Sequence, residues 1–498
     1  MKRYLYLWHR WLGIAVCLFM AMWFFSGMVM LYVGYPKLTP REHLAHLPAL
    51  PLTDCCAAPL QAGASWPDGL TLSSIAGQPV YLLPRPDQAP VVLDARSAQP
   101  LGPVDARQAL AAAAQFAPAA SAELQALIDE DAWTHSRGLD AHRPLYRIAL
   151  HDAERRLIYV SSQTGAVVRD ASGTERVWNW VGTWIHWLYP LRGNALQPIW
   201  SDTVIWLSLI ATLMALLGMV LGVLRWRRRP YRNGSHSPYS GWARWHHVTG
   251  LVAGALLVGW IFSGLMSMNP WGIFSQRAAL DVAAFSGAPA APQTGTQSLL
   301  RQFQANGWRP VELQWRQVAG RYWVTARSAD GEQRVLDAHN GQPVAQLPVE
   351  LLHGAIAAMA PARQVQFDWL SEYDFYYYPR AEHSMLGHLP KPLPVLRARF
   401  DDGRWVEVDP ATGALLSQST PARRVSRVLF ALLHSWDWLP LLQRRPLWDI
   451  WMVGFSLGGL LISISGAVLG WRRLRRRDRR RGRLARSGRA AGQRVYTG

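Results

Sequence analysis

Four apolar stretches stand out along the chain, and each is long enough to cross a bilayer. They cover about residues 12–33, 200–224, 248–268 and 448–469. A spanning helix needs ~20 residues at a rise of about 1.5 Å per residue, which each stretch supplies. Half of the 498 residues are hydrophobic and 26 are Trp, a residue typical of membrane interfaces. The pattern predicts a membrane protein with four transmembrane helices.

The two long segments between these stretches show a different pattern. Apolar and polar residues alternate in several short runs that end in Asp, Gly or Asn, as strands do. The predicted strands are residues 90–93, 146–150, 157–161, 322–326, 395–400 and 405–408. Ala-rich stretches at 104–116 and 349–359 predict short helices, and 283–297 predicts a flexible link. The two segments are therefore predicted to be α+β domains.

The first apolar helix has a copy deep inside the chain. The copy keeps a constant spacing of 237 positions, with Trp8, His9, Gly13 and Ser26-Gly27 answered by Trp245, His246, Gly250 and Ser263-Gly264. Further copies are VLDARSAQP from Val92 and VLDAHNGQP from Val335. A second set, His186, Trp200, Gly218 and Gly222, recurs 248 positions later as His434, Trp448, Gly466 and Gly470. These repeats predict an internal parallel duplication with a pseudo-two-fold axis along the membrane normal.

Basic residues flank the apolar stretches on one side only. Residues 1–10 contain three Lys or Arg, the 225–244 loop six and the 472–494 tail twelve. Because Lys and Arg collect on the cytoplasmic side, both termini are predicted to be cytoplasmic and both α+β domains to lie outside. These segments account for the formal net charge of +19, so the charge requires no nucleic-acid partner beyond contact with anionic membrane lipid.

The N-terminal helix and the cysteines exclude two simple interpretations. No clear A-x-A site follows the first helix and its copy lies within the chain, so we predict a retained helix, not a cleaved signal peptide. No CxxCH motif occurs, which excludes covalent c-type haem attachment. The adjacent Cys55 and Cys56 lie in an exported loop, where a vicinal disulfide and a bond to another molecule are both open.

Several motifs together resemble a known family. The turns SQTGAV at 162–167 and DPATGAL at 409–415 are similar to the turn of a PepSY unit. The WHR-x-x-G helix, the aromatic run 374–378, the strand 393–399 and the Leu-Leu-His before the last helix resemble the PepSY-associated transmembrane helix family. The resemblance covers nearly the whole chain, although Ser162 replaces the turn Asp and the first half lacks the aromatic run. It implies PepSY-like periplasmic domains on a bacterial inner-membrane protein.

The duplication distinguishes histidines that have a twin from those that do not. His9 pairs with His246 and His186 with His434, whereas most others are interpreted as loop histidines. Positions i+4, i+8 and i+18 share the face of residue i on a helix. They hold Gly13, Cys17 and Gly27 after His9, and Gly250, Gly254 and Gly264 after His246. A histidine above small residues suits a flat macrocycle such as haem. Close helix packing is the alternative, but it leaves two ionisable residues at membrane depth unexplained.

The membrane thickness constrains which histidines can share a ligand. His9 and His186 are predicted at opposite faces, roughly 30 Å apart. Parallel duplication instead places His9 beside His246 and His186 beside His434. We therefore predict two b-type haems held by imidazole pairs, with Gly13 and Gly250 making room at the first.

Three alternatives remain for these residues. His247 could replace His246 as a ligand. His186 and His434 could instead be anchors at headgroup level. Zinc is a weaker interpretation, because no acidic residue lies near the histidine on the first or third helix.

The resemblance also implies a function, because family members include haem-containing reductases of ferric siderophores. We expect an enzyme that takes electrons from an unidentified donor and reduces a ferric siderophore or other ferric chelate, since Fe(II) binds hard oxygen ligands more weakly. Candidate substrate contacts are Trp369, Tyr376, Tyr377, Tyr378 and Arg380, and a buried strand or interface belt is the alternative for this aromatic run. The alternative function is a membrane-anchored binding or peptidase-regulating module without redox activity.

The expected organisation follows from these features. It comprises transmembrane helices at 1–33, 200–224, 245–269 and 448–471, PepSY-like domains with interfacial helices at 34–199 and 270–447, a basic loop at 225–244 and a basic tail at 472–498.

Overall fold

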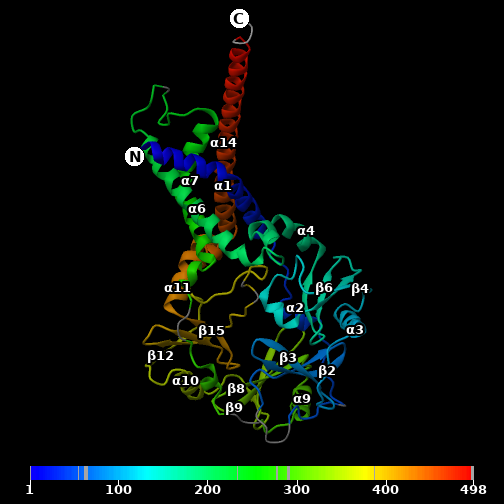
Figure 1. The fold of residues 1–498 in the computed structure, drawn as a ribbon. Helices are drawn as coiled ribbons and strands as arrows, with labels where there is room; N and C mark the ends of the chain where they lie inside the picture. The colour runs from blue at the N-terminus through cyan, green and yellow to red at the C-terminus, as the bar shows by residue number, and fades with distance from the viewer. Residues whose placement is uncertain are drawn as a thin grey trace. The chain divides into compact units, whose positions relative to one another are not determined.

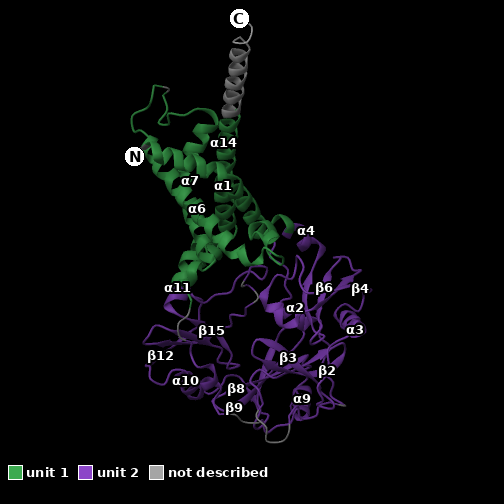
Figure 2. Ribbon diagram, in the orientation of Figure 1, with its two compact units in different colours: residues 1–32, 180–275, 425–498 green, residues 33–179, 276–424 purple. Residues whose placement is uncertain are grey.

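The computed structural model divides the chain into two compact units (Figures 1 and 2). The helical unit contains residues 1–32, 180–275 and 425–498, and the sheet unit contains 33–179 and 276–424. The structure describes residues 2–53, 55–60, 66–232, 234–275, 279–288, 292–385, 387 and 389–494, except the side chains of residues 2 and 476–494. Each unit is described below by itself.

Four long helices form the helical unit. They are α1 (Lys2–Met30), α6 (Gln197–Arg225), α7 (Gly241–Ser267) and α14 (Leu447–Arg494). Within them, Arg3–Met30, Gln197–Arg225, Gly241–Ser267 and Leu447–Arg475 are long and apolar enough to cross a membrane. This confirms the four predicted helices. Because α1 and α7 begin before the predicted spans, His9 and His246 lie inside the helices.

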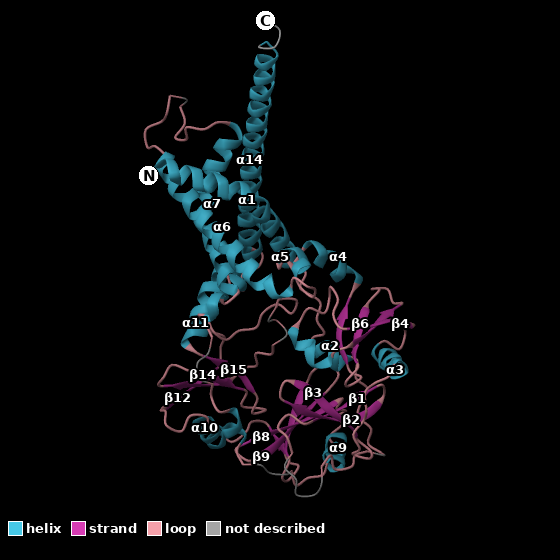
Figure 3. Cartoon of the chain, viewed as in Figure 1, coloured by secondary structure: helices cyan, strands magenta, loops and turns pink. Residues whose placement is uncertain are grey.

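The four helices pack as a bundle in which α1 and α7 each contact both α6 and α14 (Figure 3). Its buried side chains come from all four helices and include Met20, Ala211, Leu257 and Ile462. Shorter elements at the helix ends are α5 (Thr183–His186), η2 (Tyr189–Leu191), η3 (Pro270–Gly272), the π-helix η4 (Val428–Leu432), α12 (Leu433–Ser435) and α13 (Leu439–Leu442). Two of the unit boundaries fall within α4 (Gly173–Val181) and α11 (Pro421–Arg427), and the other two follow α1 and η3.

A seven-stranded sheet in the sheet unit combines strands from both halves of the sequence. Its order is β11-β10-β9-β8-β1-β2-β3. The strands are β1 (Thr71–Ile75), β2 (Gln78–Arg85), β3 (Gln88–Asp94), β8 (Glu312–Val318), β9 (Arg321–Arg327), β10 (Gln333–Asp337) and β11 (Pro343–Val344). Apolar residues of this sheet and of α9 (Thr296–Ala305) share one core.

The two halves of this sheet meet through β1 and β8. These strands pair antiparallel, with Thr71 opposite Gln314 and Leu72 opposite Leu313. Thr71 and Gln314 are 243 positions apart, which is also the spacing between the two VLDA motifs. β1 and β8 therefore occupy equivalent positions in the two halves of the sequence. They pair with each other, as expected for a local two-fold axis.

Two four-stranded sheets complete the sheet unit, and they share one topology. The first, β4-β5-β6-β7, follows α3 (Ala106–Phe116), and the second, β12-β13-β14-β15, follows α10 (Val349–Ala358). Their strands are β4 (Ala122–Ile128), β5 (Leu145–Leu150), β6 (Leu157–Ser161), β7 (Val167–Ala171), β12 (Val365–Leu370), β13 (Val395–Phe400), β14 (Trp405–Val408) and β15 (Leu415–Ser419). The predicted α+β character, strands and short helices are confirmed. In both PepSY-like turns a glycine has positive φ, Gly165 at 78° and Gly413 at 71°.

The remaining short elements of the sheet unit are α2 (Pro40–Ala45), η1 (Arg137–His142) and α8 (Val282–Ser286). The prediction of a flexible link over 283–297 was wrong at both ends, because α8 covers its start and α9 begins at Thr296. The side chain of Asp281 accepts a hydrogen bond from the Ala284 N–H, which caps the N-terminus of α8.

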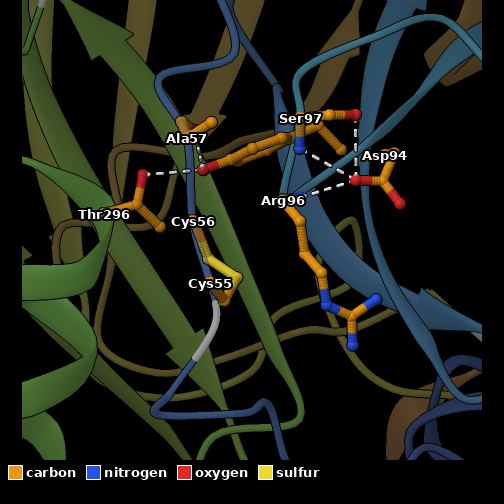
Figure 4. Close-up of a disulfide and its surroundings, with 8 residues drawn as sticks. Cys55, Cys56, Ala57, Asp94, Arg96, Ser97 and Thr296 are labelled. Atoms are coloured by element: carbon orange, nitrogen blue, oxygen red, sulfur yellow. Dashed lines mark hydrogen bonds between the residues drawn. A yellow bond between two sulfur atoms is a disulfide. The ribbon is translucent and has the colours of Figure 1, made fainter.

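Cys55 and Cys56 form a disulfide with each other in the sheet unit (Figure 4). Cys17, in α1, is free and buried. Figure 4 also shows the Asp94 carboxylate, which accepts hydrogen bonds from the N–H groups of Arg96 and Ser97. Asp337 accepts the His339 N–H in the same way. The repeated VLDA motif thus ends a strand in an Asp-stabilised turn in both halves.

Asp170 in β7 is expected to make stability depend on pH. Burial, and then the nearby Glu42 and Glu175, raise the pKa of this carboxyl to about 7. A raised carboxyl pKa gives stability that is complete below the unfolded value of about 3.9 and is lost as pH rises through about 7. Asp170→Asn should therefore stabilise the chain by up to about 4 kcal/mol at pH 8 and by less at pH 5. Thermal unfolding in detergent measures this, and an equal gain at both pH values would contradict it. The exposed Asp87→Asn is the control.

Candidate functional site

The first histidine pair is His9 on α1 and His246 on α7. Their ring centroids lie 6.2 Å apart with an interplanar angle of 40°. His9 lies about two turns after the start of α1 and His246 about one and a half turns after the start of α7, and both are half-buried. The predicted pairing of these two histidines is thus present in the geometry of the bundle.

Hydrogen bonds identify which ring nitrogen of the first pair is protonated. The Nδ1 of His9 lies 3.0 Å from the Met214 carbonyl oxygen, and the Nδ1 of His246 lies 3.1 Å from that of Ile462. A carbonyl oxygen only accepts hydrogen bonds, so each Nδ1 carries the hydrogen. The Nε2 of each neutral ring then carries the lone pair that can bind a metal.

The second histidine pair is His186 in α5 and His434 in α12, at the other end of the bundle's helices. Its centroids are also 6.2 Å apart, with an interplanar angle of 72°. The Nδ1 atoms lie 3.0 Å from the hydroxyl oxygens of Ser26 and Ser263, respectively. The two pairs therefore share one arrangement, in which Nδ1 bonds to a neighbouring helix and Nε2 remains for a ligand.

Glycines allow all four imidazoles to approach the neighbouring backbone. A Cβ added at Gly218 would lie 2.6 Å from the Cε1 of His9, closer than real Cβ atoms approach. The corresponding distance is 3.4 Å from Gly27 to His186, 3.7 Å from Gly264 to His434 and 3.4 Å from Gly466 to His246. We call each such glycine, with the residue before it, an imidazole seat.

The spacing of the imidazoles fits one metal ion between each pair. A metal–imidazole bond is about 2.0–2.1 Å and the ring centre lies roughly 1 Å beyond the nitrogen, so two opposed ligands place their centroids about 6 Å apart. No hydrogen bond reaches any of the four Nε2 atoms from the residues that the structure describes. Two facing imidazoles per site are a donor set that would suit a tetrapyrrole iron.

A structural zinc site does not fit the same residues. It requires four protein ligands. Within the described parts of the chain, no group of three or more His, Cys, Asp or Glu could hold a metal ion. The donor set is therefore limited to two imidazoles per site.

His247 is engaged elsewhere. Its Nδ1 lies 2.8 Å from the Ser237 hydroxyl and its Nε2 lies 2.9 Å from the Gly222 carbonyl oxygen. With both nitrogens hydrogen-bonded and the ring buried, His247 connects α7 to α6 and to the preceding loop. This arrangement favours His246 over His247 as the ligand.

The small residues after the first pair divide into two groups. A Cβ at Gly13 or Gly250 would meet nothing within 4 Å, so these positions leave space beside His9 and His246. A Cβ at Gly254 would instead collide with the Met219 sulfur, and one at Gly466 would lie 3.6 Å from the Cβ of Cys17, so both lie at helix-packing contacts. The inference that Gly27 and Gly264 extend the groove of the first pair was wrong, because they form the seats of the second pair.

The predicted substrate contacts lie in the sheet unit and differ in exposure. Tyr377 is fully buried with its hydroxyl bonded to the Pro392 carbonyl oxygen at 2.8 Å, and Tyr378 is buried. Both residues are therefore buried, but they lie in the loop between β12 and β13 and not in a strand. Trp369 and Tyr376 are 44% and 37% exposed. Arg380 is half-buried.

A buried ion network beside this aromatic run was not predicted. The guanidinium of Arg397 bonds to Asp374 and, at 2.8 Å, to Glu407, and the Arg397 and Glu407 side chains are 7% and 3% exposed. We expect Arg397→Leu to destabilise the chain by about 3–5 kcal/mol, because it leaves Glu407 buried without its partner. Urea unfolding in detergent, followed by Trp fluorescence, measures the change.

Arg399 is the matched control for that substitution, since it lies on the same strand. Its pair with Asp368 is 44% and 39% exposed, so Arg399→Leu should cost about 0–1 kcal/mol. Equal costs for Arg397 and Arg399 would show that the buried network does not stabilise the sheet.

Two histidines assigned to loops line a cavity in the sheet unit. The cavity has a volume of about 380 Å³, and its walls include His43, His142, Leu38 and Val168. Burial lowers the pKa of both histidines, so both are neutral at pH 7. Lacking twins in the other half, neither gave a signal in the sequence.

Four apolar helices of spanning length define a multi-pass membrane protein. The chain matches the model of the family described as PepSY-associated TM region over residues 6–362, and it therefore belongs to that family. The matched range ends before β12, so it is shorter than the resemblance inferred from the motifs. A comparison with curated proteins finds no match.

Proposed function

We propose that this protein is a bacterial inner-membrane oxidoreductase that holds two b-type haems and passes electrons across the membrane to reduce a ferric siderophore or similar ferric chelate. The observation that carries the proposal is the pair of matched sites, each with two imidazole centroids 6.2 Å apart and both Nδ1 atoms hydrogen-bonded. An anchor or binding module gives no reason for this arrangement.

The histidines and glycines have distinct roles in this proposal. His9 and His246 hold one iron, and His186 and His434 hold the other. Haem iron, when bound, supplies reversible one-electron transfer. Two imidazole ligands per iron would suit electron transfer more than the binding of a small molecule. Gly13 and Gly250 leave space beside the first pair.

The two sites are separated along the membrane normal. Seventeen residues separate His9 from Ser26, the partner of His186, which is about 25 Å of helix. Basic residues flank the helix ends nearest the first pair, so the positive-inside rule places that pair on the cytoplasmic side. The second pair and the sheet unit then lie on the periplasmic side, where the substrate would be reduced.

An internal duplication accounts for the paired sites. The bond from His9 to Met214 and the bond from His246 to Ile462 join corresponding positions, 237 and 248 residues apart. The bonds from His186 and His434 to their serines correspond in the same way. The shared topology of the two four-stranded sheets supports the same origin.

The substrate proposal rests on exposed side chains of the sheet unit. Trp369 and Tyr376 offer aromatic surface, and Tyr376 packs edge-on against Trp405 at 5.3 Å. Aromatic faces suit an aromatic or acidic chelate, whose iron is held by hard oxygen ligands. Reduction to Fe(II) would weaken those bonds and release the iron.

The absorption spectrum of the protein purified in detergent tests the proposal. We expect a Soret band, an α-band that sharpens with dithionite and two haems per chain. The reduced protein should then be reoxidised by a ferric chelate, with Fe(II) trapped by a chromogenic chelator. Absence of a Soret band would leave the non-redox binding module as the function. A haem spectrum without reoxidation by any ferric chelate would refute the substrate assignment.

A further inference from the structure

The end of the bundle that carries the first pair has a surface of exposed arginines. The sequence has no Asp or Glu in residues 1–33, 203–280 or 450–477, which form this end. Its positive charge is therefore not neutralised by carboxylates of the segments that carry it. We call six of these exposed side chains the basic face: Arg3, Arg10, Arg228, Arg229, Arg232 and Arg472.

Neighbouring arginines at this end pack on aromatic rings. The guanidinium carbon of Arg225 lies 5.0 Å from the ring centroid of Tyr6. That of Arg227 lies 4.5 Å from the ring centroid of Tyr231. An aromatic face attracts a cation without cancelling its charge. These contacts therefore hold guanidinium groups in place and leave the positive field of the surface intact.

The loop between α6 and α7, which contributes half of the basic face, is folded and anchored beside the first pair. The Tyr231 N–H donates a hydrogen bond to the Ser235 carbonyl oxygen at 2.9 Å, which closes a turn. Farther along the loop, Ser237 bonds to His247, the neighbour of the proposed ligand His246. The positive-inside rule requires basic residues near a helix end, but it does not require a folded loop anchored beside an iron ligand.

We infer that the basic face docks a soluble electron donor with an acidic surface, and that electrons enter the protein through the first pair. The inference rests on the proposed function and adds the chemical class of its electron donor. In each encounter the donor loses one electron, and the ferric chelate is the oxidant that finally gains it.

The breadth of the basic face favours a protein over a small anion. Arg10 follows Arg3 by seven residues, which is about 10 Å along α1. Arg228 and Arg472 lie on two further segments, the loop and α14. A single carboxylate or phosphate group cannot span these positions. Complementary charges spread over a protein surface steer its approach and raise the association rate.

The salt dependence of reduction tests the inference on the purified full chain in a neutral detergent. Reduced flavodoxin, a small acidic flavoprotein, and reduced methyl viologen, a cation, serve as reductants in stopped-flow absorption measurements. Raising the salt from about 0.01 M to about 1 M shortens the Debye length from about 30 Å to about 3 Å. Reduction by flavodoxin should then slow about tenfold, whereas reduction by methyl viologen should not slow. Equal responses of the two reductants would overturn the inference.

Two arginines of the loop provide the variant. Arg228→Gln combined with Arg229→Gln should slow reduction by flavodoxin severalfold at low salt and weaken its salt dependence. The matched control is Arg41→Gln with Arg107→Gln, which removes the same charge from exposed positions of the sheet unit and should leave the rate unchanged. Equal slowing in both variants would contradict docking at the basic face.

Anionic lipid is the competing occupant of this surface, and nanodiscs with and without phosphatidylglycerol distinguish it. If the lipid covers the basic face, adding it removes the salt dependence and the effect of the loop variant, and the inference fails. Persistence of both effects in the two lipid compositions supports the docked donor.

The outcomes also separate this inference from the proposed function. A protein without haem refutes the proposed function. A haem protein that dithionite reduces, but whose reduction by flavodoxin ignores both salt and the arginines, refutes only the inference.

Discussion

Replacing His9 with alanine is expected to halve the haem content of the purified protein. The remaining imidazole of His246 cannot hold the iron as an axial pair, whereas His186 and His434 lie about 25 Å away along the helices and keep theirs. Haem per chain, measured from the pyridine haemochrome spectrum, should fall from about two to about one. His434→Ala should give the same stoichiometry by removing the other haem.

His247 provides the neighbouring control. Its two nitrogens bond to Ser237 and Gly222, so His247→Ala should keep both haems even if it loosens the contact between α6 and α7. Retention of two haems in both His9→Ala and His434→Ala would show that these imidazoles are not ligands. Loss of haem in His247→Ala alone would transfer the role to that residue.

A single methyl group at Gly218 is expected to have nearly the effect of removing His9. The added Cβ would lie 2.6 Å from the imidazole, so the ring must leave its seat and lose its bond to Met214. Alanine favours a helix over glycine by about 1 kcal/mol, so helix destabilisation does not account for a loss. Gly218→Ala should therefore reduce the haem of the first pair while preserving that of the second.

Two other glycine substitutions serve as controls, because an added Cβ there would approach an imidazole less closely than at Gly218. Gly454→Ala in α14 meets nothing within 4 Å and should retain both haems. Gly466→Ala, with a contact of 3.4 Å to His246, should lie between the two. Equal haem content in all three variants would contradict the idea that the glycines exist to admit the imidazoles.

The pairing of the histidines was predictable because the repeated motifs of the sequence supply a constraint that helical periodicity lacks. Hydropathy places each histidine at a depth, and the repeat then brings twins together across a pseudo-axis. Neither step needs a side-chain contact. Helical periodicity alone was misleading for Gly27 and Gly264, because it states which face a residue occupies but not which neighbour covers that face.

The rest of the candidate site depends on contacts between segments that no local pattern connects. Ser465 hydrogen-bonds to His246, and Gly218 leaves room for the ring of His9. Each of these partners lies more than 200 positions away in the sequence. Tyr377 and Tyr376 are adjacent in the sequence, yet one is buried and the other is exposed, because the chain reverses around Asp374. β1 and β8 were not among the predicted strands, and their pairing was missed as well, since alternation identifies a strand without its partner.

During synthesis, β1 cannot pair with β8 until the ribosome has reached the second half of the chain. The edge of β1 that β8 later covers consists of unpaired N–H and C=O groups, the kind of edge that promotes aggregation. Gln314 follows Thr71 by 243 residues, which takes a ribosome roughly 10–50 s at about 5–20 residues per second. For that interval the first half carries an open strand edge, so its solubility depends on how soon the second half arrives.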